Sequence, residues 1–182
     1  MKACLLAIAL ACLAFAPAGD YTTAREKFNL IDSDHLRPGA RVTLSTRELN
    51  AYVAHEAPPG VTQTKLQIEN PGLVTGTALI DFGAVRRAQG HPPGWLLSKL
   101  LDGQRPVSVT ARVVSANGHA TVNVERVAIS GVEMDGKTLD FLIDNLLLPM
   151  YPDAAVNRPF ELGHRIDRID IQPAAVGVFI GH

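Results

Sequence analysis

The longest alternation of apolar and polar residues in this chain favours a β-hairpin, and it constrains the fold more than any other feature. Between residues 107 and 115 the apolar residues recur with the period of a strand that has one buried face. Asn117-Gly118 follows, and these residue types tolerate the positive φ angles of a tight hairpin turn. The returning segment, His119–Ile129, changes the parity of its apolar residues after Val124. The change predicts a β-bulge near Glu125-Arg126.

Four further segments have strand patterns and extend the prediction to an antiparallel sheet. Val61–Glu69 and Leu73–Phe82 form a second pair across an Asn-Pro-Gly turn. Arg165–Gln172 alternates with one slip and leads to a last strand over Ala175–Ile180. One face of the second segment is predicted to carry Val74, Gly76, Ala78, Ile80 and Phe82. Adjacent strands joined by short turns pair antiparallel.

Helical spacing predicts amphipathic helices between these strand pairs. Ser45 and Glu48 form a capping box, which begins a helix over residues 46–56. Residues 138–148 present a broad leucine-rich stripe, and residues 95–101 form a short helix that is apolar on nearly all sides. Such helices must pack on one face of the sheet or be wrapped by it, so we predict the α+β class.

The first eighteen residues are typical of a cleaved secretory signal. They contain one positive charge at Lys2, an apolar run over Ala3–Phe15, and small residues at Ala16 and Ala18. The apolar run is shorter than the about 20 residues that a membrane-spanning helix needs. We expect cleavage after Ala18, which leaves residues 19–182 as a single exported domain, periplasmic or extracellular.

Removal of this signal changes the chemistry that the domain can use. Cys4 and Cys12 both lie in it, so the mature chain has neither a disulfide nor a thiolate. An alternative is a lipoprotein attached at Cys12, but Ala9 stands where the recognition sequence needs a branched residue. Loss of Lys2 changes the net charge from −1 to −2, and such a balance gives no reason to expect nucleic-acid binding.

The sequence contains no recognisable catalytic or cofactor motif. It lacks a Gly-x-Ser-x-Gly nucleophile turn, a phosphate-binding glycine loop and a His-Glu-x-x-His zinc helix. Asp32, Asp34 and His35 are metal-ligand types, although we favour a solvated turn for them. We therefore expect no enzyme, no metal and no cofactor. A hydrolase would require His91 or His164 beside acids in a deep cleft.

The apolar helices and strand faces favour a site for an apolar ligand. Aromatic residues make up only 5% of the chain, so the surface available is mostly aliphatic, as an acyl-chain pocket would be. The candidate lining residues are Ile80, Phe82, Trp95, Leu96, Leu100, Leu142 and Leu146. The alternative is that all of these side chains fill a solid core.

Residues 83–94 are predicted to form a loop that carries Arg86, Arg87 and His91. The two arginines suit contact with an anionic headgroup at a membrane surface, although arginines in a polar loop are commonly only solvated.

The run Leu44–Tyr52, with its Glu-Leu-Asn helix opening, resembles the YpmS-like and YceB-like exported bacterial proteins, which are related to tubular lipid-binding (TULIP) domains. The likeness extends to Gly76-Thr77-Ala78, the hairpin at Asn117-Gly118, the helix over residues 139–148 and the strand over residues 166–171. The resemblance implies a curved antiparallel sheet that wraps a helix and leaves an apolar groove for lipid. It implies no catalytic residues.

These patterns and the resemblance lead to one expected function and one alternative. We expect an exported binding protein that holds a hydrophobic ligand, such as a lipid, between sheet and helices. The alternative is a cell-envelope interaction or structural module, which would dock a partner protein through a sheet edge or the Trp95 helix.

Overall fold

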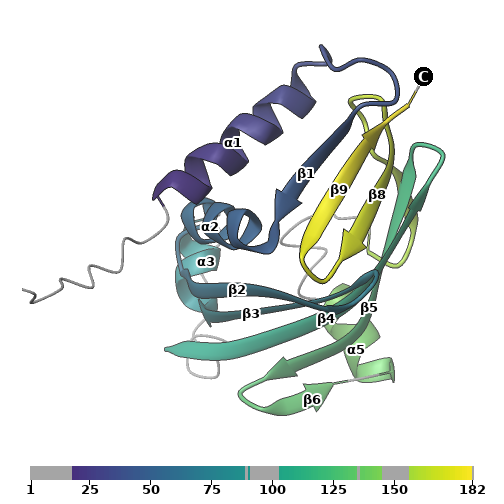
Figure 1. The fold of residues 1–182 in the computed structure, drawn as a ribbon. Helices are drawn as coiled ribbons and strands as arrows, with labels where there is room; N and C mark the ends of the chain where they lie inside the picture. The colour runs from purple at the N-terminus through teal and green to yellow at the C-terminus, as the bar shows by residue number, and fades with distance from the viewer. Residues whose placement is uncertain (1–17, 89, 91–102, 135, 145–155, 182) are drawn as a thin grey trace, which may run out of the picture.

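Two antiparallel sheets, rather than one, organise the described part of this chain (Figure 1). The computed structural model describes residues 18–88, 90, 103–134, 136–144 and 156–181. The smaller sheet has the order β1-β9-β8, and the larger one has the order β2-β3-β4-β5-β6, with β7 also paired to β5. The strands are β1 (Arg41–Ser45), β2 (Val61–Asn70), β3 (Leu73–Asp81), β4 (Gln104–Ala116), β5 (His119–Ile129), β6 (Val132–Met134), β7 (Pro159–Glu161), β8 (Ile166–Gln172) and β9 (Ala175–Ile180). The helices are α1 (Ala18–Asp32), α2 (Thr46–Glu56), α3 (Phe82–Ala88) and α5 (Gly136–Leu142). The predicted α+β class is confirmed.

The small sheet and helix α1 enclose a fully buried aliphatic core. Leu44 of β1 is 1% exposed, and Ala24 of α1 is completely buried. The other buried members of this cluster are Ile31, Val42, Val178 and Ile180. Phe28, Leu49 and Tyr52 of the two helices pack against it from the side. Figure 1 shows α1 running beside β1, with α2 at its lower end.

The large sheet has one apolar face and one polar face, because paired residues of neighbouring strands share a face. Val109 of β4 pairs with Gly76 of β3 and Val127 of β5, whereas Thr110 pairs with Thr75 and Arg126. The register shifts after Thr110, so that Glu125 is the extra residue on β5. The predicted bulge near Glu125-Arg126 and the hairpin at Asn117-Gly118 are therefore confirmed.

The free edge of β8 joins the small sheet to the large one. The Ser115 hydroxyl of β4 accepts a hydrogen bond from the Ile169 amide at 2.7 Å and donates one to the Ile169 carbonyl at 2.8 Å. Gly118 donates to the Asp167 carbonyl at 2.8 Å, and Gly72 donates to the Ile171 carbonyl at 3.0 Å. Outward backbone groups along β8 thus have partners from the tips of the two hairpins.

Three features differ from the prediction. The segment after β3 is helical over Phe82–Ala88, not a loop, because the Asp81 carboxylate accepts from the Ala84 amide and begins α3. Phe82 is thus a helix residue and does not continue the face of β3. The short strands β6 and β7 were not predicted, since three residues give no readable period.

Candidate functional site

The apolar face of the large sheet is the principal candidate site. We define it by the residues of β2 to β5 that share the side of Val109 and have aliphatic side chains or none, namely Val61, Leu66, Ile68, Val74, Gly76, Ala78, Ile80, Val107, Val109, Ala111, Val113, Ala120, Val122, Val124, Val127 and Ile129. Only Ile68 and Ala120 of this set are fully buried, and the rest are half-buried. The core face of the small sheet differs, since its central residues are fully buried.

The predicted lining residues are only partly placed by the described structure. Ile80 lies on the apolar face, paired with Val61 and Arg105. Phe82 is 7% exposed and begins α3. Leu142 ends α5, and its side chain is not described. Trp95, Leu96, Leu100 and Leu146 lie outside the described residues. The shared lining of these seven residues therefore stays a prediction.

One charged residue was missed at the end of the apolar face. Arg105 lies two residues before Val107 on β4, pairs with Ile80, and is half-buried. The two-residue spacing of Arg105, Val107 and Val109, which places them on one side of a strand, was visible in the sequence. The strand was nevertheless expected to begin only at Val107. No carboxylate of the described residues lies within ion-pair distance of Arg105, whereas Arg112 bonds Glu125 at 2.6 Å on the polar face.

A buried hydroxyl without a partner lies in the β2 bulge. The register places Gln63 and Thr64 opposite Ala78, with Gln63 in a left-handed conformation at φ 51°. Among the described residues, the Thr64 Oγ1 atom is the one buried side-chain oxygen or nitrogen that lacks a hydrogen bond. A hydroxyl in that state is costly to bury.

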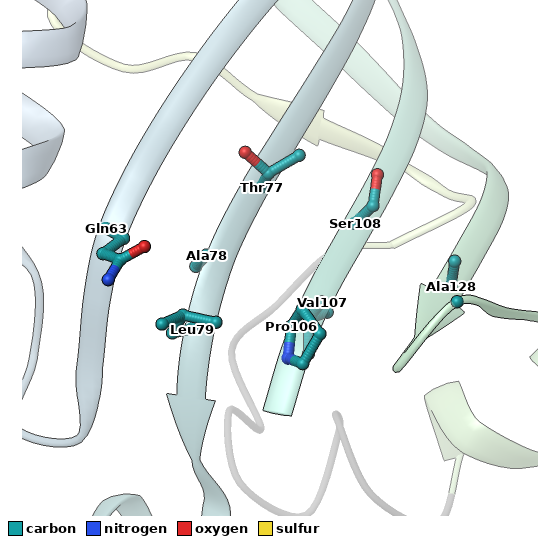
Figure 2. A pocket seen from close by; sticks show the side chains of 9 residues that line it. Gln63, Thr77, Ala78, Leu79, Pro106, Val107, Ser108 and Ala128 are labelled. Carbon is teal, nitrogen blue, oxygen red and sulfur yellow. The ribbon is translucent and has the colours of Figure 1, made fainter. Parts of the chain in front are cut away.

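The polar face of the large sheet carries a shallow hollow of about 320 Å³ (Figure 2). Its lining residues are Gln63 of β2, Thr77, Ala78 and Leu79 of β3, Pro106, Val107 and Ser108 of β4, Ala128 of β5, and Gly131. Thr77, Leu79, Pro106, Ser108 and Ala128 lie on the opposite side of the sheet from Val109, whereas Ala78 and Val107 belong to the apolar face. The hollow thus opens mainly on the polar face, and its lining offers hydroxyl groups, the Gln63 amide and small apolar surfaces without a charge.

The Glu-Leu-Asn opening of α2 has structural roles. Glu48 completes the predicted capping box with Ser45, and its carboxylate also accepts from Lys27 at 2.7 Å. Burial alone would raise the pKa of Glu48, but the hydrogen bonds from Lys27 and from Ser45 outweigh it and lower that pKa. The Asn50 side chain bonds both backbone groups of Leu66, accepting at 2.7 Å and donating at 2.9 Å. It therefore occupies the edge of β2.

Two clusters with histidine lie on the surface. The His164 ring is 3.5 Å from the Asp34 carboxylate and 3.9 Å from that of Asp32, and all three side chains are more than 40% exposed. The hydrolase alternative needed such a cluster in a deep cleft. On α1 and α2, Tyr21 stacks on His55 and donates to Glu56 at 2.8 Å.

The Tyr21 hydrogen bond changes two titrations. It raises the pKa of Tyr21 and, together with the His55 contact, lowers the pKa of Glu56.

The two arginines of the predicted loop lie on α3 instead. Arg87 is exposed, and a methyl group on Gly83 would meet the Arg87 guanidinium at 3.1 Å and the Asp81 carboxylate at 3.2 Å. The Arg87 charge therefore lies on the same side of α3 as a negative charge. Membrane contact through Arg86 and Arg87 stays a prediction.

The described ranges contain neither a metal-binding cluster nor a membrane-spanning helix. Asp32, Asp34 and His35 do not form a metal site, and no other group of three or more His, Cys, Asp or Glu residues is placed to hold a metal ion in those ranges. No helix among the described residues is long and apolar enough to cross a membrane.

The chain was also compared with known proteins. No protein-family model, no curated protein and no solved structure matches it.

Proposed function

We propose that this chain is an exported binding protein that holds an apolar ligand against the apolar face of its large sheet. The observation that carries the proposal is the half-burial of that face across four strands, next to a small sheet whose core is fully buried. Apolar surface that stays in contact with water costs about 25 cal/mol per Å². A ligand that covers the face would recover this energy.

The side chains of the face favour an aliphatic ligand. Val107, Val109, Val127 and their neighbours supply branched alkyl groups. At the centre of the face, Gly76 has no side chain and Ala78 has only a methyl group, so little atomic bulk rises above the backbone there. A methyl group on Gly76 would meet only the end of the Leu66 side chain, at an ordinary 3.5 Å. An alkyl chain can lie along such a surface. The resemblance to the YpmS-like and YceB-like groups supports the same reading.

The interaction-module alternative has less support at the strand edges. Lys27 donates to the Thr43 carbonyl of β1, and Asn50 bonds the Leu66 backbone of β2. Ser115 bonds the Ile169 backbone of β8. A partner that adds a strand needs unpaired edge groups, and those of Thr43, Leu66 and Ile169 already have partners within the chain.

The test begins with the protein purified without detergent from a bacterial host. Native mass spectrometry is expected to show a mass excess, and solvent extraction is expected to release an aliphatic compound. A matched pair of variants locates it: Val109→Glu places a charge on the apolar face, and Ser108→Glu places one on the polar face. We expect Val109→Glu to abolish the mass excess and Ser108→Glu to retain it.

Circular dichroism and thermal unfolding show whether Val109→Glu stays folded. Should it unfold, Ala78→Phe, which adds bulk instead of charge to the same face, replaces it. An empty wild-type protein that also fails to bind an environment-sensitive apolar dye would overturn the proposal. Equal loss of ligand in the two glutamate variants would move the site away from the apolar face.

A further inference from the structure

We infer that the ligand of the apolar face is a long-chain monocarboxylate, with its carboxylate on Arg105 and its alkyl chain along β4. The inference rests on the proposed function and specifies its ligand class. It begins from a single charged position on an otherwise apolar face.

Arg105 is the only charged residue among the described positions of β2 to β5 that share the side of Val109. The other arginines of this hairpin point to the polar face and have partners there. Arg112 bonds Glu125 at 2.6 Å, and Arg126 lies 3.5 Å from Glu133. Arg105 is half-buried and has no carboxylate partner among the described residues.

A guanidinium in that position is suited to a carboxylate. A charge taken partly out of water needs a counter-charge, and the planar guanidinium donates two parallel hydrogen bonds to a carboxylate. One unpaired arginine balances one negative charge, so a monoanion fits better than a dianionic phosphate.

The face is also long enough to hold one alkyl chain. From Arg105 the same side of β4 continues through Val107, Val109 and Ala111 to Val113. At about 3.3 Å per residue, the path from Arg105 to Val113 is roughly 26 Å long. A lipid tail in one leaflet spans about 15 Å, half the hydrocarbon thickness of a bilayer. The face ends where the Ser115 hydroxyl bonds β8.

The experiment compares two probes with the same sixteen-carbon chain, hexadecanoate and hexadecanol, by titration into delipidated protein. The wild type is expected to bind hexadecanoate about 10- to 100-fold more tightly, which is the range of a charge-assisted hydrogen bond. Arg105→Gln is expected to lose that preference and to keep its affinity for hexadecanol. Arg126→Gln, which removes an exposed arginine of the polar face, is the matched control and should keep the preference.

A charge reversal gives a second, positive readout. Arg105→Glu is expected to reject hexadecanoate and to bind hexadecylamine in its place, with wild-type circular dichroism. Equal binding of hexadecanoate and hexadecanol by the wild type overturns the carboxylate inference and leaves the proposed function standing. Failure of both probes to bind at all overturns the two together.

Discussion

Replacement of Asn50 by leucine tests whether one side chain protects the edge of the large sheet. The Asn50 amide accepts from the Leu66 amide at 2.7 Å and donates to the Leu66 carbonyl at 2.9 Å. It also donates to the Thr46 carbonyl one turn earlier in α2, at 2.8 Å. Leucine has a similar size and fits a helix, but it leaves both Leu66 backbone groups without these partners.

The magnitude follows from those two orphaned groups. An unsatisfied buried donor or acceptor costs about 1–3 kcal/mol, and the half-buried position of Leu66 lets water offset part of the cost. Leucine also has a helix propensity better than that of asparagine by a few tenths of a kcal/mol. We expect Asn50→Leu to lower the free energy of unfolding by about 2–3 kcal/mol. For a domain of this size, the loss lowers Tm by roughly 5–10 °C.

Thermal and urea unfolding of three variants provides the assay. Asn29→Leu is the matched control, because Asn29 is exposed on α1 and its side chain makes no hydrogen bond to a described residue. The control is expected to change stability by less than about 0.5 kcal/mol. Asn50→Asp keeps the acceptor and loses the donor, so its loss should grow as the new carboxylate ionises. If Asn50→Leu proved no less stable than Asn29→Leu, the edge-capping argument would be refuted.

Two further predictions concern the Glu48 carboxylate, which bonds Lys27 and Ser45, and the Ser115 hydroxyl, which bonds β8. Glu48 has a lowered pKa in the fold, so its contribution to stability is present above its ordinary pKa of about 4.3 and is lost as pH falls through the lowered value. Glu48→Gln should cost about 2 kcal/mol at pH 7, from the weakened cap and the lost ion pair. The unfolding free energy of the Glu48→Gln variant should also depend less on pH than that of the wild type between about pH 3 and 5. If the two proteins gave parallel profiles of unfolding free energy against pH, the lowered pKa of Glu48 would be contradicted. Ser115→Ala should cost about 1–2 kcal/mol by urea denaturation, because the Ile169 amide and carbonyl lose their partner. Ser108→Ala on the polar face is the control, and equal effects of the two changes would show that the Ser115 contacts contribute little.

Local features of the fold were predictable because their causes are local. The parity change after Val124 located the Glu125 bulge, and the slip in Arg165–Gln172 corresponds to the register shift after Ile166. The Ser45 capping box was readable because its two hydrogen bonds join residues three positions apart. A period or a spacing within one element contains all the information that these features need.

Long-range features were not predictable, and each has a physical reason. β1 pairs with β9, more than 120 residues later, and a five-residue strand with two buried side chains does not identify its partner. Asn50 and Ser115 read as ordinary polar residues, since their partners are backbone atoms of distant strands. Arg105 was missed because the strand was expected to begin at Val107, whereas β4 begins at Gln104.

Two features of the described structure bear on recognition: the strand edges that side chains already bond, and the half-buried apolar face of the large sheet. A sheet can pair its unbonded edge groups with an added strand, or it can bury its apolar face under another element or a ligand. Side chains of Lys27, Asn50 and Ser115 already bond backbone groups at three edges. The face around Val109 remains half-buried even so. An occupant of this molecule should therefore lie along the face, where area, rather than backbone hydrogen bonding, provides the affinity. An aliphatic chain anchored at Arg105 meets that requirement.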